Sequence, residues 1–238
     1  MHIAIIGTGR AGASFALALD RVGHEVALHH HDDLDALGSA DLVLLAVPDD
    51  AIALTAAGLA VRESQVVAHV AGSRNLDVLA PHPRVGAMHP LVPLPSDERG
   101  AERLVGATYS VAGDRVIDDV VGSLRGRVLR LSDAQRTAYH ATASVAANHL
   151  VALMGHVAEL ARSAGLDLED FLPLAQLALL DVVELGPQAA LTGPASRADM
   201  ATIDAHLAAI PERERSTYVA LANAAFELAE RRRARTPV

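Results

Sequence analysis

Three groups of residues in this sequence have the types and spacing that chemistry on a small ligand requires. The first is the glycine-rich segment Gly7-Thr8-Gly9-Arg10-Ala11-Gly12. In a GxGxxG loop, the first glycine allows a tight turn, the second lets the backbone approach a pyrophosphate, and the third lets a helix pack closely on a strand. The helix that follows offers free N–H groups to the phosphates. We therefore predict a dinucleotide-binding loop, and a turn that merely needs glycine is the alternative.

The residues at the end of the second expected strand should distinguish NAD from NADP. The ribose of the cofactor is read about 20 residues after the glycine loop, which falls here at His30 and His31, followed by Asp32–Asp33. Histidines together with Arg10 could accommodate a 2′-phosphate, so we predict NADP, and the two aspartates keep NAD open. Neighbouring residues of a strand point to opposite faces, so we predict no metal site in this run of histidines.

The loops after the next strands should line the nicotinamide side of the cofactor. Val47 and Pro48 end the apolar run DLVLLAV, Ser73 follows the run QVVAHV, and His89-Pro90 follows the next strand. In open α/β sheets, ligands bind at the carboxyl ends of the strands. We expect all three loops on one rim, and ordinary loop chemistry is the alternative for each.

The second group is a polar stripe on a helix otherwise rich in alanine. His140, Ser144 and Asn148 are each four residues apart, so on an α-helix they share one face. We predict that the stripe faces the cleft between two domains, where it holds a substrate and His140, with an ordinary pKa of about 6.5, passes a proton. An interhelical hydrogen-bond network or packing against a partner subunit would also explain it.

A third cluster follows the loop Thr192-Gly193-Pro194. Ser196 could cap the next helix, and Arg197 suits a bidentate contact with a substrate carboxylate. Asp199 could pair with Arg197 or orient His206. The alternative is a capped helix with a solvated charge pair.

Seven short apolar runs predict the strands that carry these loops, at 2–6, 25–29, 41–47, 65–70, 85–88, 108–112 and 127–131. They alternate with helical segments, the first at 13–22, which is typical of an α/β domain with a parallel sheet. From residue 134 onward only helices are indicated, at 134–164, 168–185, 197–209 and 214–233.

We therefore place a Rossmann-type NAD(P)-binding domain at residues 1–132 and an all-α substrate and dimerisation domain at residues 133–238. The segment 171–185 has almost no polar face, so we expect it to be buried on all sides, within its domain or in a homodimer.

The composition excludes several classes of protein. The net charge of -9 argues against nucleic acid as a partner. The chain has no cysteine, so thiolate chemistry is excluded and a cytoplasmic location is expected. Neither a signal peptide nor a membrane span is expected from the apolar runs. All 20 basic residues are arginine, so no lysine can act as an acid or form a Schiff base.

The segments GTGRAG, ADLVLLAVPDDAI, GAMHPL, YHATASVAANHLVAL and GPQAALTGPASRAD together resemble one family along nearly the whole chain. It is the family of Rossmann-like proteins with a C-terminal helical domain of unknown function 2520. That family is similar to the superfamily of ketopantoate reductase, pyrroline-5-carboxylate reductase and 6-phosphogluconate dehydrogenase-like proteins. The resemblance implies a two-domain NAD(P)-dependent oxidoreductase that dimerises through its helical domain.

The resemblance also marks the residues that match the family's signature segments: Gly7, Gly9, Gly12, Tyr139, His140, Asn148, Thr192, Gly193, Pro194, Arg197 and Asp199. Many members have a lysine shortly before the Tyr-His pair, where this chain has Arg136 or Thr137. The β-hydroxyacid dehydrogenases place a catalytic lysine where Ser144 stands. A lysine-acid mechanism is therefore excluded for this chain.

We expect an NADP-dependent reductase that acts on a C=O or C=N bond of a small carboxylate-bearing metabolite. In that reading His140 donates the proton, Ser144 and Asn148 position the substrate, and Arg197 binds its carboxylate, while Asp199 pairs with Arg197 or orients a histidine. A dinucleotide-binding sensor or dimeric partner without turnover is the alternative, since the chain lacks lysine. A dehydrogenase for a bulkier metabolite is a third reading.

Overall fold

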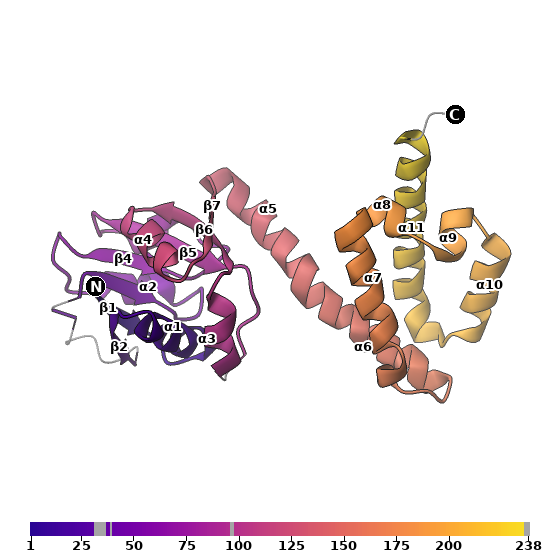
Figure 1. The fold of residues 1–238 in the computed structure, drawn as a ribbon, viewed down its shortest axis with the longest axis horizontal. Coiled ribbons are helices and arrows are strands. Elements are labelled where there is room, and N and C mark those ends of the chain that lie inside the picture. The colour runs from indigo at the N-terminus through magenta and orange to yellow at the C-terminus, as the bar shows by residue number, and fades with distance from the viewer. Residues whose placement is uncertain (31–36, 39, 96–97, 236–238) are drawn as a thin grey trace. The chain divides into compact units, whose positions relative to one another are not determined.

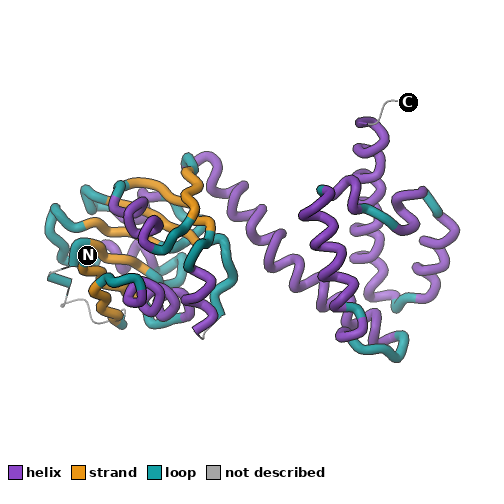
Figure 2. Tube along the Cα trace, viewed as in Figure 1, coloured by secondary structure: helices purple, strands orange, loops and turns teal. Residues whose placement is uncertain are grey.

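The structure is a computed structural model that describes residues 1–30, 37–38, 40–95 and 98–235. It divides into two compact units, Met1–Ala147 and Asn148–Val238. The first unit contains all the strands described, and the second is helical (Figures 1 and 2). The predicted fold class, a Rossmann-type sheet domain followed by an all-α region, is confirmed.

The first unit is built on a seven-stranded sheet with the order β2-β1-β3-β4-β5-β6-β7. Its strands are β1 (His2–Ile6), β2 (Glu25–His29), β3 (Leu42–Leu45), β4 (Val66–His69), β5 (Val85–Pro90), β6 (Thr108–Gly113) and β7 (Arg127–Arg130). All seven predicted strands form. Neighbouring strands are parallel except β5 and β6, which are antiparallel, so the sheet is mostly rather than entirely parallel.

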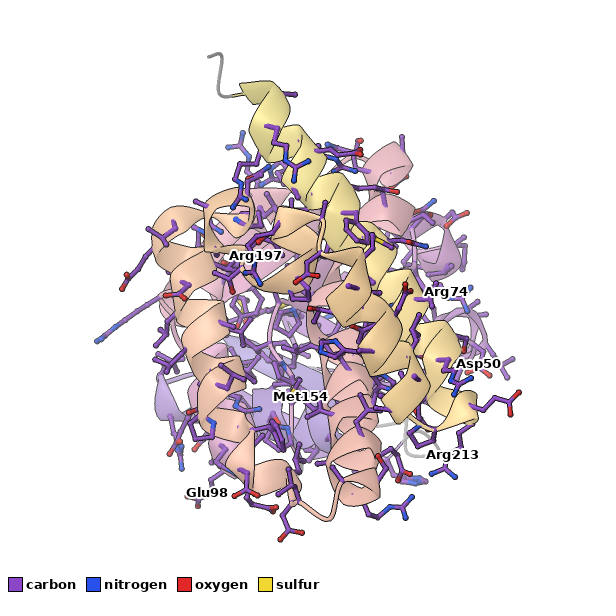
Figure 3. The ribbon with its side chains drawn as sticks, turned by 90° about the vertical axis from the view of Figure 1, so that its right-hand side faces the viewer. Asp50, Arg74, Glu98, Met154, Arg197 and Arg213 are labelled. Carbon is purple, nitrogen blue, oxygen red and sulfur yellow. The ribbon has the colours of Figure 1, made fainter. Side chains whose placement is uncertain are left out.

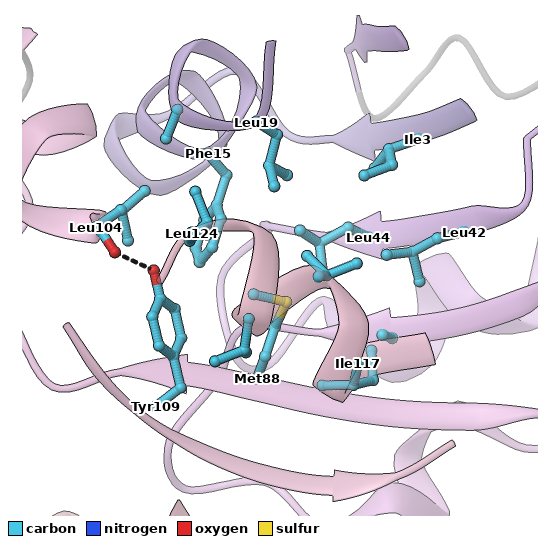
Figure 4. Packing of buried hydrophobic residues seen from close by; sticks show 14 of the residues in the cluster. Ile3, Phe15, Leu19, Leu42, Leu44, Met88, Leu104, Tyr109, Ile117 and Leu124 are labelled. Atoms are coloured by element: carbon cyan, nitrogen blue, oxygen red, sulfur yellow. Dashed lines mark hydrogen bonds between the residues drawn. The ribbon is translucent and has the colours of Figure 1, made fainter. Parts of the chain in front are cut away.

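Both faces of the sheet are buried, which explains why the central strands read as continuous apolar runs. Ile3, Ile5 and Leu44 point to one face, where they pack with Phe15 and Tyr109. Figure 4 shows this cluster, in which the Tyr109 hydroxyl donates a hydrogen bond of 2.6 Å to the Leu104 carbonyl oxygen. The alternate residues Ala4, Ile6, Val43 and Leu45 form a second cluster on the other face with Ile52 and Leu79.

Helices cover this sheet and connect its strands. They are α1 (Arg10–Arg21), α2 (Ile52–Ala57), η1 (Leu76–Leu79), α3 (Glu98–Leu104) and α4 (Val116–Ser123), and α5 (Asp133–Ser144) follows the last strand. The first helix begins at Arg10, inside the glycine loop, and not at residue 13 as expected. Its N-terminus therefore lies directly at the loop that was predicted to bind phosphates.

The second unit consists of short and long helices only, within the part of it that the structure describes. A π-helical turn, η2 (Val145–His149), spans the boundary between the units, and α6 (Leu150–Ser163), η3 (Leu168–Asp170), α7 (Leu172–Leu185), α8 (Pro187–Ala190), α9 (Gly193–Arg197), α10 (Met200–Ala209), η4 (Glu212–Glu214) and α11 (Arg215–Arg235) follow. Two predicted helices are thus interrupted. The π-turn divides 134–164, and Ala198, with a φ of 57°, separates α9 from α10.

The predicted domain boundary at residue 132 coincides with the start of α5, whereas the two compact units meet after Ala147. Where the chain divides into independently folding domains stays a prediction.

Helix α7 differs from the expectation that it is buried on all sides. None of its side chains is buried in the single chain, and Leu174, Leu177 and Val183 are 67%, 59% and 81% exposed. Hydropathy alone cannot distinguish a helix that is buried within its own domain from one whose apolar side chains would be covered by another chain. Homodimerisation therefore stays a prediction. Among the described residues, no helix is both long and apolar enough to cross a membrane.

Candidate functional site

The three glycines of the loop after β1 occupy three different environments. Gly7 has a φ of +114°, and a Cβ atom there would lie 2.5 Å from the Ala46 carbonyl oxygen. A Cβ atom on Gly12 would lie 1.7 Å from the Gly7 carbonyl oxygen, so this glycine lets α1 pack against the turn. A Cβ atom on Gly9 would have no atom within 4 Å. The open side of the loop is therefore at Gly9, where a pyrophosphate would approach the backbone.

A pocket of about 490 Å³ adjoins this open side, and its size is typical of small-ligand sites. Its lining comes entirely from the first unit: Gly9–Ala11 and Phe15 from the loop and α1, Ala46–Asp49 after β3, Val70–Gly72 after β4, His89, Pro90, Val92 and Leu94 from β5 and the segment after it, and His140 from α5. The carboxyl ends of β1, β3, β4 and β5 thus meet at one rim.

Most of the predicted cofactor residues lie at or beside this pocket. Gly9, Arg10, Ala11, Val47 and Pro48 line it. The other members are Gly7 and Gly12, which shape the turn, Thr8, which is exposed between them, and Ser73 in the loop after β4. The Ser73 hydroxyl donates a hydrogen bond of 2.5 Å to Asp49 Oδ2 and so ties the loop after β4 to the loop after β3.

The predicted ribose-reading residues are less informative. His30 is exposed just after β2 and is not part of the pocket lining. His31 and the aspartates that follow it lie outside the described residues. The choice between NADP and NAD therefore stays a prediction. Within the described ranges, no group of three or more histidine or acidic side chains could hold a metal ion.

His89 and His140 line the pocket, and Tyr139 of α5 contacts His89. His89 Nδ1 lies 2.9 Å from the Tyr139 hydroxyl, and the two rings are perpendicular. The His140 ring centroid lies 6.0 Å from that of His89. Gly72 permits this arrangement, because a Cβ atom there would lie 2.8 Å from His140 Nδ1 and 2.9 Å from His89 Cε1. His140, the predicted proton donor, therefore reaches the same pocket as the glycine loop.

Burial shifts the pKa values of His89, His69 and Tyr139. Burial, and then the charge of His140, lower the pKa of His89 to about 4, although Asp49 opposes the shift. Burial also lowers the pKa of His69, at the end of β4, to about 4. Burial raises the pKa of Tyr139. At neutral pH, His69, His89 and Tyr139 are therefore all uncharged.

The remaining predicted catalytic residues are not gathered in this pocket. Ser144 is the last residue of α5, and Asn148 is exposed in the π-helical turn, so the regular α-helical spacing behind the predicted stripe ends at Ser144. Arg197 is exposed at the end of α9 (Figure 3). Asp199 caps α10, accepting hydrogen bonds of 3.1 Å from the Thr202 amide and 2.8 Å from its hydroxyl. Ser196, expected as a cap, instead donates to the Gly193 carbonyl oxygen.

Several residues beside the pocket were given no role by the sequence analysis. His69 sits inside an apolar run, Arg136 is 1% exposed one helical turn before His140, and Ser110 is buried opposite His89 on β6. A histidine within an otherwise apolar strand was the signal that could have indicated His69.

The glycine loop, the helix N-terminus at the loop and the strand-end pocket together define a protein with a Rossmann-type fold. The sequence profile of a Rossmann-like domain matches residues 27–95. The profile described as domain of unknown function (DUF2520) matches residues 105–225, just over half of the chain. The chain belongs to this DUF2520 family, which confirms the resemblance.

Solved structures share the fold over almost the whole chain. A Bacteroides fragilis protein named as a candidate NADP oxidoreductase is 24% identical, with a TM-score of 0.78 over 95% of this chain and 98% of its own. A reductive aminase from Aspergillus terreus, in complex with NADPH and ethyl levulinate, is 17% identical, with a TM-score of 0.68 over 95% and 93%. Pyrroline-5-carboxylate reductase from Streptococcus pyogenes is 15% identical, with a TM-score of 0.62 over 98% of both chains. No curated protein sequence matches this chain.

Proposed function

We propose that this protein is an NADP-dependent oxidoreductase that reduces a C=O or C=N bond of a small, carboxylate-bearing metabolite. One observation carries the proposal: a single pocket joins the open side of the glycine loop to His89 and His140. It thus brings a dinucleotide-type phosphate loop and proton-carrying side chains to one place. The reductive aminase structure with NADPH and a keto ester supports this reaction class, because it has the same fold.

The residues present fit a nicotinamide dinucleotide. Gly9 leaves the loop open for a pyrophosphate, and α1 begins at Arg10 without an acidic residue in its first turn. Its N–H groups therefore attract phosphate. When bound in reduced form, such a cofactor supplies the hydride that a C=O or C=N carbon accepts. Val47, Pro48 and the tied loop at Ser73 would hold the nicotinamide side.

The protein must then supply a proton to the oxygen or nitrogen of the reduced bond. His140 is our candidate donor, because it lines the pocket and its ring is next to His89. His89 is neutral above a pH of about 4, so it serves as a hydrogen-bond partner of Tyr139 and not as a charged acid. No lysine competes for this role, since the chain contains none.

Ser144 and Asn148 keep their predicted role in substrate positioning as part of this proposal, and Arg197 is the residue that the sequence predicted to bind the carboxylate. An Arg197→Ala enzyme should show a strongly raised KM if its guanidinium binds the substrate, and unchanged kinetics would remove that role. We also propose a homodimer formed through the helical domain, supported by the exposed leucines of α7.

A non-catalytic dinucleotide sensor is the second candidate, and the absence of lysine favours it. Titration with NADPH and with NADH, followed by fluorescence, tests both functions. A panel of keto acids and imines is then added to the tighter complex, and cofactor absorbance is followed. Oxidation of NADPH by a panel member supports the reductase. Binding without oxidation by any member favours the sensor, and no binding of either nucleotide rejects both.

A further inference from the structure

Buried polar atoms without a hydrogen-bond partner are concentrated beside the pocket. Among the described residues, they include His69 Nδ1, Ser110 Oγ, both Nη atoms of Arg136 and His140 Nδ1. More than nine in ten buried polar groups in native proteins have a partner, so a local concentration of unpartnered ones needs an explanation. One such explanation is a polar ligand that these atoms hold in the working protein.

The strands place two of these side chains, His69 and Ser110, beside His89. His69 on β4 is in register with Ala87 on β5, and Ala87 and His89 point to the same face because they are two residues apart. His69 and His89 are therefore neighbours on one face of the sheet. Ser110 on β6 is directly opposite His89. The three side chains thus lie side by side on three adjacent strands.

Helix α5 adds the charge. Arg136 and His140 are four residues apart on this α-helix, so they share a face. The same helix is joined to β5 by the hydrogen bond between Tyr139 and His89. Arg136 also lies close enough to His69, His89 and Tyr139 for its charge to influence the pKa of all three groups.

The Arg136 guanidinium lacks an adequate counter-charge. Its side chain is 1% exposed, and Nε lies 3.4 Å from Asp133 Oδ1, on a side chain that is 60% exposed. Nη1 and Nη2 have no partner among the described residues. Arginine stays protonated in proteins, so burial cannot remove this charge. A buried cation is costly without a paired anion.

We propose that Arg136 binds the carboxylate of the substrate, in a seat formed with His69, Ser110 and His140. This inference rests on the proposed function and names the anchor of its substrate. A planar carboxylate matches the two Nη donors, and its negative charge would pair with a guanidinium whose one ion pair among the described residues is with the exposed Asp133. His69 and His89 are neutral at pH 7 and add no further charge. Because the Nη atoms are shielded from solvent, the surrounding side chains must shift to admit the anion.

Acetate and acetamide are the probes for this seat, because they share a shape and differ in charge. The full-length chain is titrated with each while the imidazole ring signals are followed by NMR. We expect acetate, and not acetamide, to shift the signals of His69 and His140. Arg136→Gln should weaken acetate binding at least tenfold, and Arg136→Lys should weaken it less. Arg115→Gln, which changes an exposed arginine of the same unit, is the matched control and should bind like the wild type.

Three results would contradict the proposed carboxylate site at Arg136. They are equal binding of acetate and acetamide, unchanged acetate binding by Arg136→Gln, and loss of acetate binding in Arg197→Gln but not in Arg136→Gln. The last result would place the carboxylate at Arg197. NADPH titration of the same samples separates the two proposals. NADPH binding without acetate binding rejects only the seat, and acetate binding without nucleotide binding rejects only the proposed function.

Arg136→Met provides a test that does not depend on detecting the ligand by NMR. If the guanidinium is unpaired without substrate, an apolar side chain of similar length should leave Tm unchanged or raise it in buffer without carboxylates. Acetate should then raise the Tm of the wild type but not of the variant. A lower Tm for Arg136→Met without acetate would show that the arginine has a structural partner, and would reject the seat.

Discussion

At the scale of single residues, the glycine motif combines two requirements that the sequence pattern does not separate. Gly7 and Gly12 are needed by the protein's own packing, because a Cβ atom on either would collide with backbone. Gly9 is not needed for packing, because the space around it is open. The proposed function gives a reason for glycine at this position, because a pyrophosphate would approach the backbone there.

This difference predicts opposite behaviour for two alanine substitutions. Gly9→Ala should leave the free energy of unfolding nearly unchanged and weaken NADPH binding at least tenfold, because the methyl group occupies the approach to the backbone. Gly12→Ala should destabilise the protein by about 3 kcal/mol through overpacking. Urea unfolding and fluorescence titration measure the two effects. Equal NADPH affinity for Gly9→Ala and the wild type would contradict the assigned site.

His69 and His89 should make stability depend on pH. Their pKa values are about 4 in the folded protein, against about 6.5 when unfolded. Between these values the unfolded chain binds more protons, so stability is complete above a pH of about 6.5 and is lost as the pH falls toward 4. The loss should be on the order of 3 kcal/mol for each histidine.

Urea unfolding at pH 7 and at pH 5 measures the part of this loss that falls above pH 5, about 2 kcal/mol for each histidine. His69→Gln and His89→Gln should each show a smaller difference between the two pH values than the wild type. A wild-type protein that is equally stable at both would show that these histidines are not buried as described.

At the scale of elements, α7 is an apolar helix that has no buried side chain in the single chain. Many of its leucines and valines are exposed, and so large an exposed apolar patch is unusual on the surface of a monomeric protein. Helix α2 offers a comparison, because its exposed Leu54 is a single apolar side chain and not part of such a surface.

The homodimer proposal predicts that Leu177→Glu yields a monomer, because a carboxylate would be buried without a partner in the interface. Leu54→Glu, a change of the same type at an exposed leucine of the first unit, should leave the dimer intact. Sedimentation equilibrium distinguishes the two states. A wild-type chain that is monomeric at high concentration would reject the proposal, as would a dimer that persists in Leu177→Glu.

At the scale of the whole molecule, every residue that lines the pocket belongs to Met1–Ala147. Ligand binding should therefore stabilise this unit directly. NADPH at a hundred times its Kd should raise the free energy of unfolding of the first unit by about 2.7 kcal/mol.

Amide hydrogen exchange can localise this effect. Exchange should slow in β1, β3 and α1, and should change little in α7 and α11. Equal slowing throughout both units would show that the nucleotide also contacts or orders the second unit, contrary to a pocket formed by the first unit alone.

The sequence by itself determined the strands, the glycine loop and the helical character of the second unit. These features depend on residues close together in the chain: apolar runs such as DLVLLAV, a six-residue glycine pattern, and helical periodicity. The sequence also excluded catalysis by lysine, because the chain contains none, and this conclusion requires no structure. His140 was identifiable because a histidine on an alanine-rich helix is conspicuous.

Only the tertiary structure brought His69, His89, Ser110 and Arg136 together, because they come from three strands and one helix that are distant in sequence. Strand register decides which side chains become neighbours, and burial decides their charge. The sequence marked Arg136 only as a position where many family members have a lysine, and the structure alone shows that both Nη atoms of its guanidinium are buried without a hydrogen-bond partner. Likewise, α7 has the composition of a buried helix, and only the packing of the chain shows that its apolar side chains remain exposed.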